Sequence, residues 1–235
     1  FVPDGANGGT ATLSYRAWDQ TAGSAGAKVV PDAGGGTSAF SSASDTASLA
    51  VTPVNDAPVL APVSPALTPI NEDATANAGQ TVASFLDTSI SDADSGAAQG
   101  IAITSVNSGN GQWQYALNGG TSWTSMGSPS TGAALLLRAS DQVRFVPDAQ
   151  NATTASFGYR AWDQTSGSAG STADTSTVGG SSAFSTGNNT ATITVSSVND
   201  APPLVPGKSN LLAVSEAAAS SPAQTVGRLV TGSAT

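Results

Sequence analysis

The sequence contains no histidine and no cysteine, and Met126 is its single methionine. A Ser-His-Asp relay, a thiolate nucleophile and a Cys/His zinc site therefore cannot be built from this chain. No pair of carboxylates is singled out for glycoside hydrolysis either, so we expect no enzymatic activity. Because no disulfide can form, stability has to come from a packed core, from bound ions, or from both.

Basic residues are also scarce, since 7 Lys and Arg stand against 16 Asp and Glu, for a net charge of −9. This balance argues against nucleic acid or an anionic membrane surface as partner and favours cations. Only Glu72 and Glu216 are glutamates; most aspartates lie in turn-like contexts, where short carboxylates can converge on a metal. No apolar run reaches the length of a membrane span, so we expect no membrane insertion. The sequence opens at Phe1 without a charged-then-apolar stretch, so we expect neither a signal peptide nor an anchor in it, and its start reads as an excerpt.

An internal repeat organises the chain. The motif Phe-Val-Pro-Asp at residues 1–4 returns at 145–148, an offset of 144 residues without gaps. The same offset relates Tyr-Arg-Ala-Trp-Asp-Gln, Val-Asn-Asp-Ala-Pro and Gln-Thr-Val in both copies. We therefore expect three parts: the C-terminal part of one repeat (1–56), a complete repeat (57–200) and the N-terminal part of the next (201–235).

Within the complete repeat, apolar residues alternate with polar ones at the strand period over 142–146, 155–159 and 191–195. The segments 113–117 and 121–123 flank Asn-Gly-Gly, which predicts a hairpin. Short strands with frequent turns predict an all-β fold of tandem antiparallel β-sandwiches, one per 144-residue unit. Gly/Ser-rich stretches at 21–38 and 165–182 are predicted to be solvated, mobile loops. Trp18 and Trp162 are expected in the core.

At the junction between units, a strand-like run ends in Asn55-Asp56-Ala57-Pro58, where Pro58 keeps the link extended. This linker resembles those of the cadherin superfamily, and more closely the cadherin-like repeats of giant, RTX-type bacterial surface adhesins exported by type I secretion. Ala-Trp-Asp at 17–19 and 161–163 stands in the place of the family's Ala-x-Asp, and Glu72 lies sixteen residues after Asp56. Asp92-Ala93-Asp94 matches the family's Asp-x-Asp pair. The Asp-Arg-Glu element of animal cadherins is absent, and only Phe-Val-Pro-Asp stands near its place.

The resemblance implies Greek-key, cadherin-like (Ig-like) sandwiches with Ca²⁺ bound at the junctions, where calcium takes about six to eight oxygen ligands. It implies a first site formed by Asn55, Asp56, Asp92, Asp94 and Asp163, with Asp4 contributed from the preceding unit. It implies a second site near Glu72, Asp148, Asn199 and Asp200. Taken alone, Asp92 and Asp94 also fit a solvated turn, and Asn55 and Asp56 also fit a cap on the strand end.

The same resemblance implies a secreted or cell-surface structural extender, stiffened by calcium, whose partners are neighbouring repeats of the same chain. Other copies in an extracellular filament are an alternative partner. A second class of function is a carbohydrate- or ice-binding module. Trp113, Tyr115 and Trp123 fall on one face of the predicted hairpin and could stack on surface glycans, although core packing is the more economical use of these side chains. The only sequence feature that favours ice binding is the short Thr-x-Thr segment at 190–194.

Overall fold

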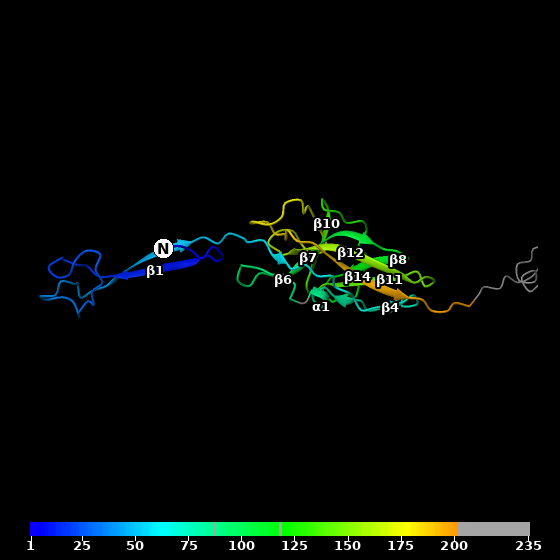
Figure 1. The fold of residues 1–235 in the computed structure, drawn as a ribbon, viewed down its shortest axis with the longest axis horizontal. Coiled ribbons are helices and arrows are strands. Elements are labelled where there is room, and N and C mark those ends of the chain that lie inside the picture. The colour runs from blue at the N-terminus through cyan, green and yellow to red at the C-terminus, as the bar shows by residue number, and fades with distance from the viewer. Residues whose placement is uncertain (87, 118, 202–235) are drawn as a thin grey trace, which may run out of the picture. The chain divides into compact units, whose positions relative to one another are not determined.

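The computed structural model describes residues 1–86, 88–117 and 119–201. Nearly all of its regular structure is β, as predicted, and the elements can be followed in Figure 1. The elements are β1 (Gly9–Tyr15), β2 (Asp45–Val51), β3 (Val59–Leu60), β4 (Ile70–Asn71), β5 (Gln80–Thr81), α1 (Ala83–Leu86), β6 (Ile90–Ser91), β7 (Gly100–Asn107), β8 (Gly111–Ala116), β9 (Thr124–Ser125), β10 (Ala134–Arg138), β11 (Gln142–Pro147), β12 (Thr153–Trp162), β13 (Thr172–Ala173) and β14 (Asn189–Ser196).

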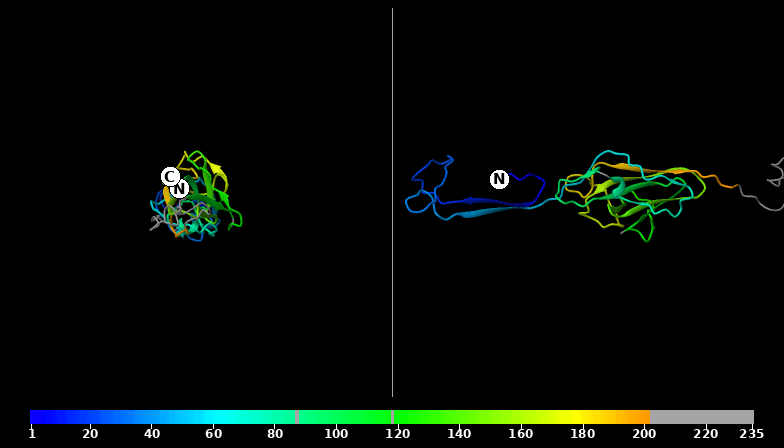
Figure 2. Two further views of the ribbon diagram at one scale, coloured as in Figure 1. Left: turned by 90° about the vertical axis from the view of Figure 1, so that its right-hand side faces the viewer. Right: turned by 90° about the horizontal axis from the view of Figure 1, so that it is seen from below.

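Two sheets make the body of the complete repeat. One has six strands in the order β13-β10-β7-β12-β14-β4, and the other has four in the order β5-β11-β8-β9. Pairings within these sheets are antiparallel except that of β14 with β4. The strands of this body run alongside one another in Figure 1 and again in the right-hand view of Figure 2. The predicted β-sandwich is therefore confirmed in this coarse form.

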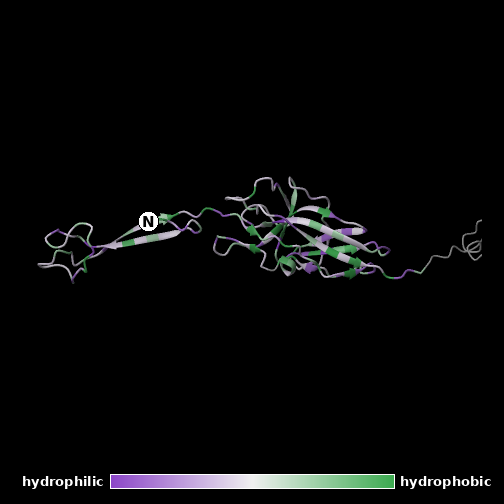
Figure 3. Ribbon diagram, viewed as in Figure 1, coloured by the Kyte–Doolittle hydropathy of each residue, from purple (hydrophilic) through white to green (hydrophobic). Residues whose placement is uncertain are grey.

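The main core lies between these two sheets, because alternate residues of each strand point inward. In β12, Phe157 and Tyr159 are buried, and they face Trp113 of β8 and Phe145 of β11 in one hydrophobic cluster. Trp113 packs edge-to-face on Phe145 (ring centroids 5.2 Å apart) and on Phe157 (5.0 Å). Apolar and polar positions alternate along the strands in Figure 3.

A second, smaller cluster lies on the opposite face of the six-stranded sheet. Leu136 alternates with its core-facing neighbours in β10 and packs instead with Trp162 and Phe184. The segment predicted to be a solvated loop, 165–182, covers this face: its strand β13 pairs with β10, and Thr175 is buried with its backbone N–H bonded to the Thr131 carbonyl at 2.7 Å. Sequence reasoning missed this packing because small polar side chains carry no hydrophobic signal.

A hairpin forms here as predicted, since β8 pairs antiparallel with β9 (Tyr115 opposite Thr124), but its second strand is Thr124–Ser125 and not the predicted segment 121–123. Gly119 and Gly120 have φ values of 76° and 56°, the left-handed backbone that the Asn-Gly-Gly motif predicts. Asn118 lies outside the described residues.

The N-terminal copy of the repeated sequence forms a hairpin of its own, β1–β2, which is a separate two-stranded sheet. Gly9 pairs with Val51 and Tyr15 with Asp45 in a continuous antiparallel register. The chain divides into two compact units at Ser197, and of the second unit (residues 198–235) the structure describes 198–201.

Candidate functional site

The linker residue Asn55 is tied to the loop that follows β12. Its side-chain N–H donates to Asp163 Oδ2 at 2.9 Å and to the Ser182 carbonyl at 3.3 Å. Two residues further on, the Ala57 N–H donates to the Gly180 carbonyl at 2.8 Å and adds a second contact between the linker and this loop. Asp163, which lies 108 positions away in sequence, is thus in contact with the linker.

Asp56 is tied in the same way to the Asp-x-Asp pair. Its backbone N–H donates to Asp94 Oδ2 at 2.8 Å, and the Asp94 N–H donates to Asp92 Oδ1 at 2.9 Å. Leaving Asp4 aside, the residues predicted for the first calcium site thus form two hydrogen-bonded groups, Asn55 with Asp163 and Asp56 with Asp94 and Asp92, which are joined by the peptide bond between Asn55 and Asp56. Asp92 Oδ2 is buried and has no hydrogen-bond partner among the described residues.

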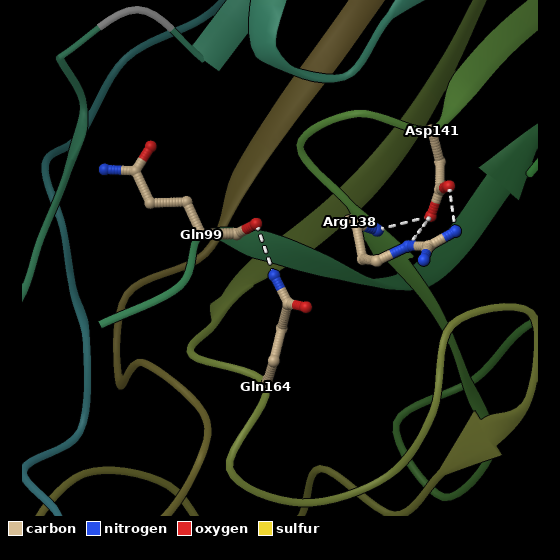
Figure 4. A network of polar contacts seen from close by, with 4 residues as sticks. All are labelled: Gln99, Arg138, Asp141 and Gln164. Carbon is tan, nitrogen blue, oxygen red and sulfur yellow. Dashed lines mark hydrogen bonds and ion pairs between the residues drawn. The ribbon is translucent and has the colours of Figure 1, made fainter. Parts of the chain in front are cut away.

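Asp163 is held in place by its own turn. It is 4% exposed, and its Oδ1 accepts hydrogen bonds from the Thr165 N–H (2.8 Å) and hydroxyl (2.6 Å). Gln164 sits in the left-handed region (φ 69°), and its side chain donates to the Gln99 carbonyl at 2.8 Å. Figure 4 shows this contact fixing the turn against the start of β7.

Beside this turn, Arg138 forms a 2.7 Å ion pair with the fully buried Asp141 (Figure 4). The Asp141 carboxylate also accepts from the Arg138 backbone N–H at 2.7 Å. The hydrogen-bonded Asp141 side chain raises the pKa of Arg138 above its ordinary value. Sequence reasoning did not single out this pair; the spacing of Arg and Asp across a Ala-Ser turn was its only signal.

Electrostatically, the junction is an uncompensated acidic region. Among the described residues, no Lys or Arg lies within ion-pair distance of Asp56, Asp92, Asp94 or Asp163. Like charges at close range repel, and the repulsion grows where water is partly excluded. The carboxylates nevertheless do not converge tightly: the described residues hold no group of three or more acidic side chains arranged as a ready-made metal cluster.

Asp4, predicted to reach this site from the preceding unit, makes a local turn. Its Oδ1 accepts from the backbone N–H groups of Ala6 (3.0 Å) and Asn7 (3.1 Å), and these bonds lower the pKa of Asp4 below its ordinary value. Asn7, which sequence reasoning passed over, accepts a 3.2 Å hydrogen bond from the Ser95 N–H, next to Asp94. Its position three residues after Asp4 in a turn-forming segment was the available signal.

The second predicted site is described only in part. Glu72 is 1% exposed, and its backbone N–H donates to the Ser196 carbonyl at 3.0 Å. Asp148 repeats the turn of Asp4, with hydrogen bonds from the Asn151 side chain and the Gln150 backbone lowering its pKa. Asn199 and Asp200 belong to the second unit, where the Asn199 side chain donates to the Asp200 carbonyl at 3.4 Å.

The aromatic side chains of the β8–β9 hairpin do not form a glycan-stacking platform. Trp113 is 1% exposed and belongs to the core, and Tyr115 packs against that core while partly buried. Trp123 is partly exposed, but the Arg144 guanidinium lies 4.2 Å from its ring centroid. The core packing that sequence analysis preferred is therefore confirmed for Trp113 and Tyr115, which share the inward face of β8.

Comparison with protein-family models, with curated proteins and with solved structures found no match to this chain. In the described part of the chain, no helix combines the length and apolar character needed to cross a membrane.

Proposed function

We propose that this chain is a stretch of a structural extender: cadherin-like, Greek-key β-sandwiches repeated every 144 residues in a long secreted or cell-surface bacterial protein. In this proposal, calcium at the inter-repeat junctions stiffens the array, which holds an adhesive region away from the cell. The junction residues carry the proposal. Asn55, Asp56, Asp92, Asp94 and Asp163 are gathered at one end of the sandwich, without a basic partner among the described residues.

The donor set suits calcium chemically. The four aspartates and the Asn55 side-chain carbonyl offer hard oxygen ligands, which calcium accepts in loosely constrained geometry. Asp92 Oδ2 is a buried oxygen without a hydrogen-bond partner among the described residues, and a cation would satisfy it. Bound calcium would neutralise the clustered charge and lower the repulsion that otherwise favours bending at the linker.

Calcium titration calorimetry of the full chain tests this assignment. We expect saturable binding that Asp92→Asn weakens at least tenfold, because the substitution removes one negative charge and one ligand oxygen. Asp174→Asn is the matched control: Asp174 is an exposed aspartate whose Oδ1 likewise accepts from the N–H two residues on (2.9 Å). The calcium site would be refuted if no heat of binding were detected. It would also be refuted if Asp92→Asn and Asp174→Asn weakened binding equally.

Stiffening is tested separately by small-angle scattering with calcium and then with chelator. We expect the chelated chain to show a broader distribution of interatomic distances, because the extended linker before Pro58 then bends more freely. The Asp92→Asn variant should resemble the chelated chain in both conditions. A calcium-independent distribution would remove the mechanical role while leaving the binding result intact.

Ice binding is a second candidate function, favoured by one observation. Hydroxyl side chains face outward in cross-strand pairs on β12 and β14, where Thr154 lies opposite Thr194 and Ser156 opposite Thr192. Pairing thus adds Thr154 and Ser156 of β12 to the Thr-x-Thr segment of β14. Thermal hysteresis that is lost in Thr194→Lys would support it, and freezing behaviour equal to that of a control protein would remove it.

A further inference from the structure

The turn that Asp4 makes ends in an Asn-Gly dipeptide, Asn7-Gly8, to which the proposed function assigns no role. Both residues are exposed, and so are their equivalents Asn151 and Ala152 within the complete repeat, so this exposure belongs to the turn itself. Asparagine before glycine loses its side-chain amide spontaneously, because glycine has no Cβ to keep its backbone nitrogen away from the asparagine Cγ. The dipeptide is therefore a candidate for covalent change without an enzyme.

The structure leaves the attacking nitrogen of Gly8 free and holds the group that it attacks. Among the described residues, the Gly8 N–H donates to no acceptor. The Asn7 Oδ1 accepts the Ser95 N–H at 3.2 Å, which polarises the side-chain carbonyl toward attack at Cγ. Packing also favours glycine here, since a Cβ at Gly8 would lie 2.6 Å from Pro53 Cδ.

The second copy of the turn differs at two linked positions. Ala152 stands in place of Gly8, and Ser197 stands in place of Pro53, the residue that a Cβ at Gly8 would meet. The Ala152 Cβ hinders the approach of its own nitrogen to the side chain of Asn151. The same turn therefore occurs once with a reactive dipeptide and once without it.

Asn110 precedes a glycine as well, but the fold holds both of these residues. The Asn110 carbonyl accepts the Asp148 N–H at 3.1 Å, and its side chain donates to the Ala152 carbonyl at 3.3 Å. Gly111 begins β8, where a Cβ would collide with an aromatic ring of β11, so its backbone is closely packed. Asn118, which also precedes a glycine, lies outside the described residues.

We propose that Asn7 is a deamidation site, at which the neutral side chain beside the junction becomes a carboxylate. The Gly8 nitrogen loses its proton to solvent and attacks the Asn7 Cγ, and the Cγ–Nδ2 bond breaks to release ammonia and leave a succinimide ring. Water then adds to one of the two ring carbonyls and opens the ring. The product is aspartate in the ordinary linkage or in the β linkage, and no oxidant or reductant is consumed.

The new carboxylate lies beside the candidate calcium site. At Asn7 it faces the same Ser95 N–H, next to Asp94, which is hydrogen-bonded to Asp56 and Asp92. One more negative charge strengthens the attraction for a cation, and it strengthens the repulsion between carboxylates when no cation is bound. This regulation of calcium affinity rests on the proposed function, whereas the deamidation itself does not.

Peptide mapping by mass spectrometry tests the modification on the full chain, incubated in mildly alkaline buffer, through the mass gained when an amide NH₂ is replaced by OH. We expect Asn7 to react at least about tenfold faster than Asn110 and Asn151, because of these three it alone combines a following glycine with an unrestrained turn. In urea, Asn7 and Asn110 should react at equal rates, since both precede glycine. Equal rates in the folded chain, or a difference that persists in urea, would overturn the proposal.

A pair of variants tests the role of Gly8. Gly8→Ala combined with Pro53→Ser reproduces the second copy of the turn and should slow the reaction at Asn7 to the rate at Asn151. Pro53→Ser alone is the matched control and should leave the rate at Asn7 unchanged. A double variant that reacts as fast as the original chain would also overturn the proposal.

The regulatory step has its own measurement. Asn7→Asp reproduces the product in the ordinary linkage and should tighten calcium binding about threefold to tenfold in titration calorimetry, as expected of one added charge near a solvated cation. Unchanged affinity, in a chain whose binding Asp92→Asn still weakens, would overturn the regulation and leave the proposed function standing. If no form of the chain binds calcium, the proposed function and the regulation both fail, and the deamidation at Asn7 is unaffected.

Discussion

Residues 1–56 and 145–200 are two copies of one sequence in two surroundings, and most of their local structure is the same. Gly9 opposite Val51 and Thr153 opposite Val195 are equivalent pairs in the same register. The bridge between Trp18 and Phe40 recurs between Trp162 and Phe184, and the positive φ of Gln20 (67°) recurs at Gln164 (69°). Strand pairing and turns in this segment are therefore set by its own residues.

Burial is where the copies differ. Tyr15 is 50% exposed and its equivalent Tyr159 is fully buried, because the segment 57–144 covers this face of the strand in the second copy alone among the described residues. An isolated two-stranded hairpin gains little from hydrophobic burial and is marginally stable in water. The comparison separates what local sequence specifies from what the rest of the repeat contributes.

Truncating the equivalent side chain in the two copies should give the largest difference in stability between them. Phe157→Ala should lower the free energy of unfolding by about 3–5 kcal/mol, because it leaves a cavity between Trp113 and Phe85. Leu13→Ala should change it by no more than about 0.5 kcal/mol, since the side chain is exposed. Urea unfolding followed by tryptophan fluorescence measures both, and equal losses would contradict the contrast.

The next largest loss of stability is expected at Gly100 in the sandwich, with Gly9 in the exposed hairpin as the comparison. A Cβ at Gly100 would lie 2.7 Å from a ring carbon of Trp162 and 2.8 Å from the Leu137 carbonyl oxygen. Gly100→Ala should therefore destabilise the sandwich by about 1–3 kcal/mol through overpacking. Gly9 in β1 has nothing within 4 Å of such a Cβ, so Gly9→Ala is the control and should be close to neutral. Thermal unfolding of the two variants distinguishes them.

The two tyrosines provide a smaller, pH-dependent difference. Burial raises the pKa of the Tyr159 phenol above its ordinary value of 10.0. Above pH 10 the unfolded chain loses this proton while the folded chain retains it, so Tyr159 contributes a loss of stability as pH rises. Tyr159→Phe should reduce the alkaline loss seen in urea unfolding between pH 9 and 11, taken as roughly one unit on either side of that value. Tyr15→Phe, on the exposed copy, is the matched control; an equal effect of both would contradict the assignment.

Much of the fold follows from sequence because its signals are local. Alternation identified the buried positions of β11, β12 and β14, and the glycines after Asn118 identified the hairpin turn. The parallel pairing of β4 with β14 and the packing of β13 on β10 are non-local, and they involve two-residue strands that leave no periodic pattern. The burial of Trp162 was predicted, but the packing of residues 165–182 around it was not, because their small polar side chains carry no hydrophobic signal.

For the candidate site, the sequence predicted which residues belong to it but not how their side chains are oriented. The family resemblance implied Asn55, Asp56 and Asp163, and hydrogen bonds place Asn55 beside Asp163 and Asp56 beside the Asp-x-Asp pair. Side-chain direction is set by turns that the sequence pattern does not resolve, so the local turn of Asp4 and the contact of Asn7 with Ser95 were not foreseen.

Thermal unfolding of the full chain in calcium and in chelator tests the proposed extender most directly. Calcium at about 100 times its dissociation constant should raise the melting temperature by roughly 5–10 °C, because it binds the folded junction and not the unfolded chain. Asp92→Asn combined with Asp94→Asn should abolish the rise, and Asp174→Asn should leave it intact. A melting temperature that is the same in calcium and in chelator would contradict the account and leave an ion-independent β-sandwich array.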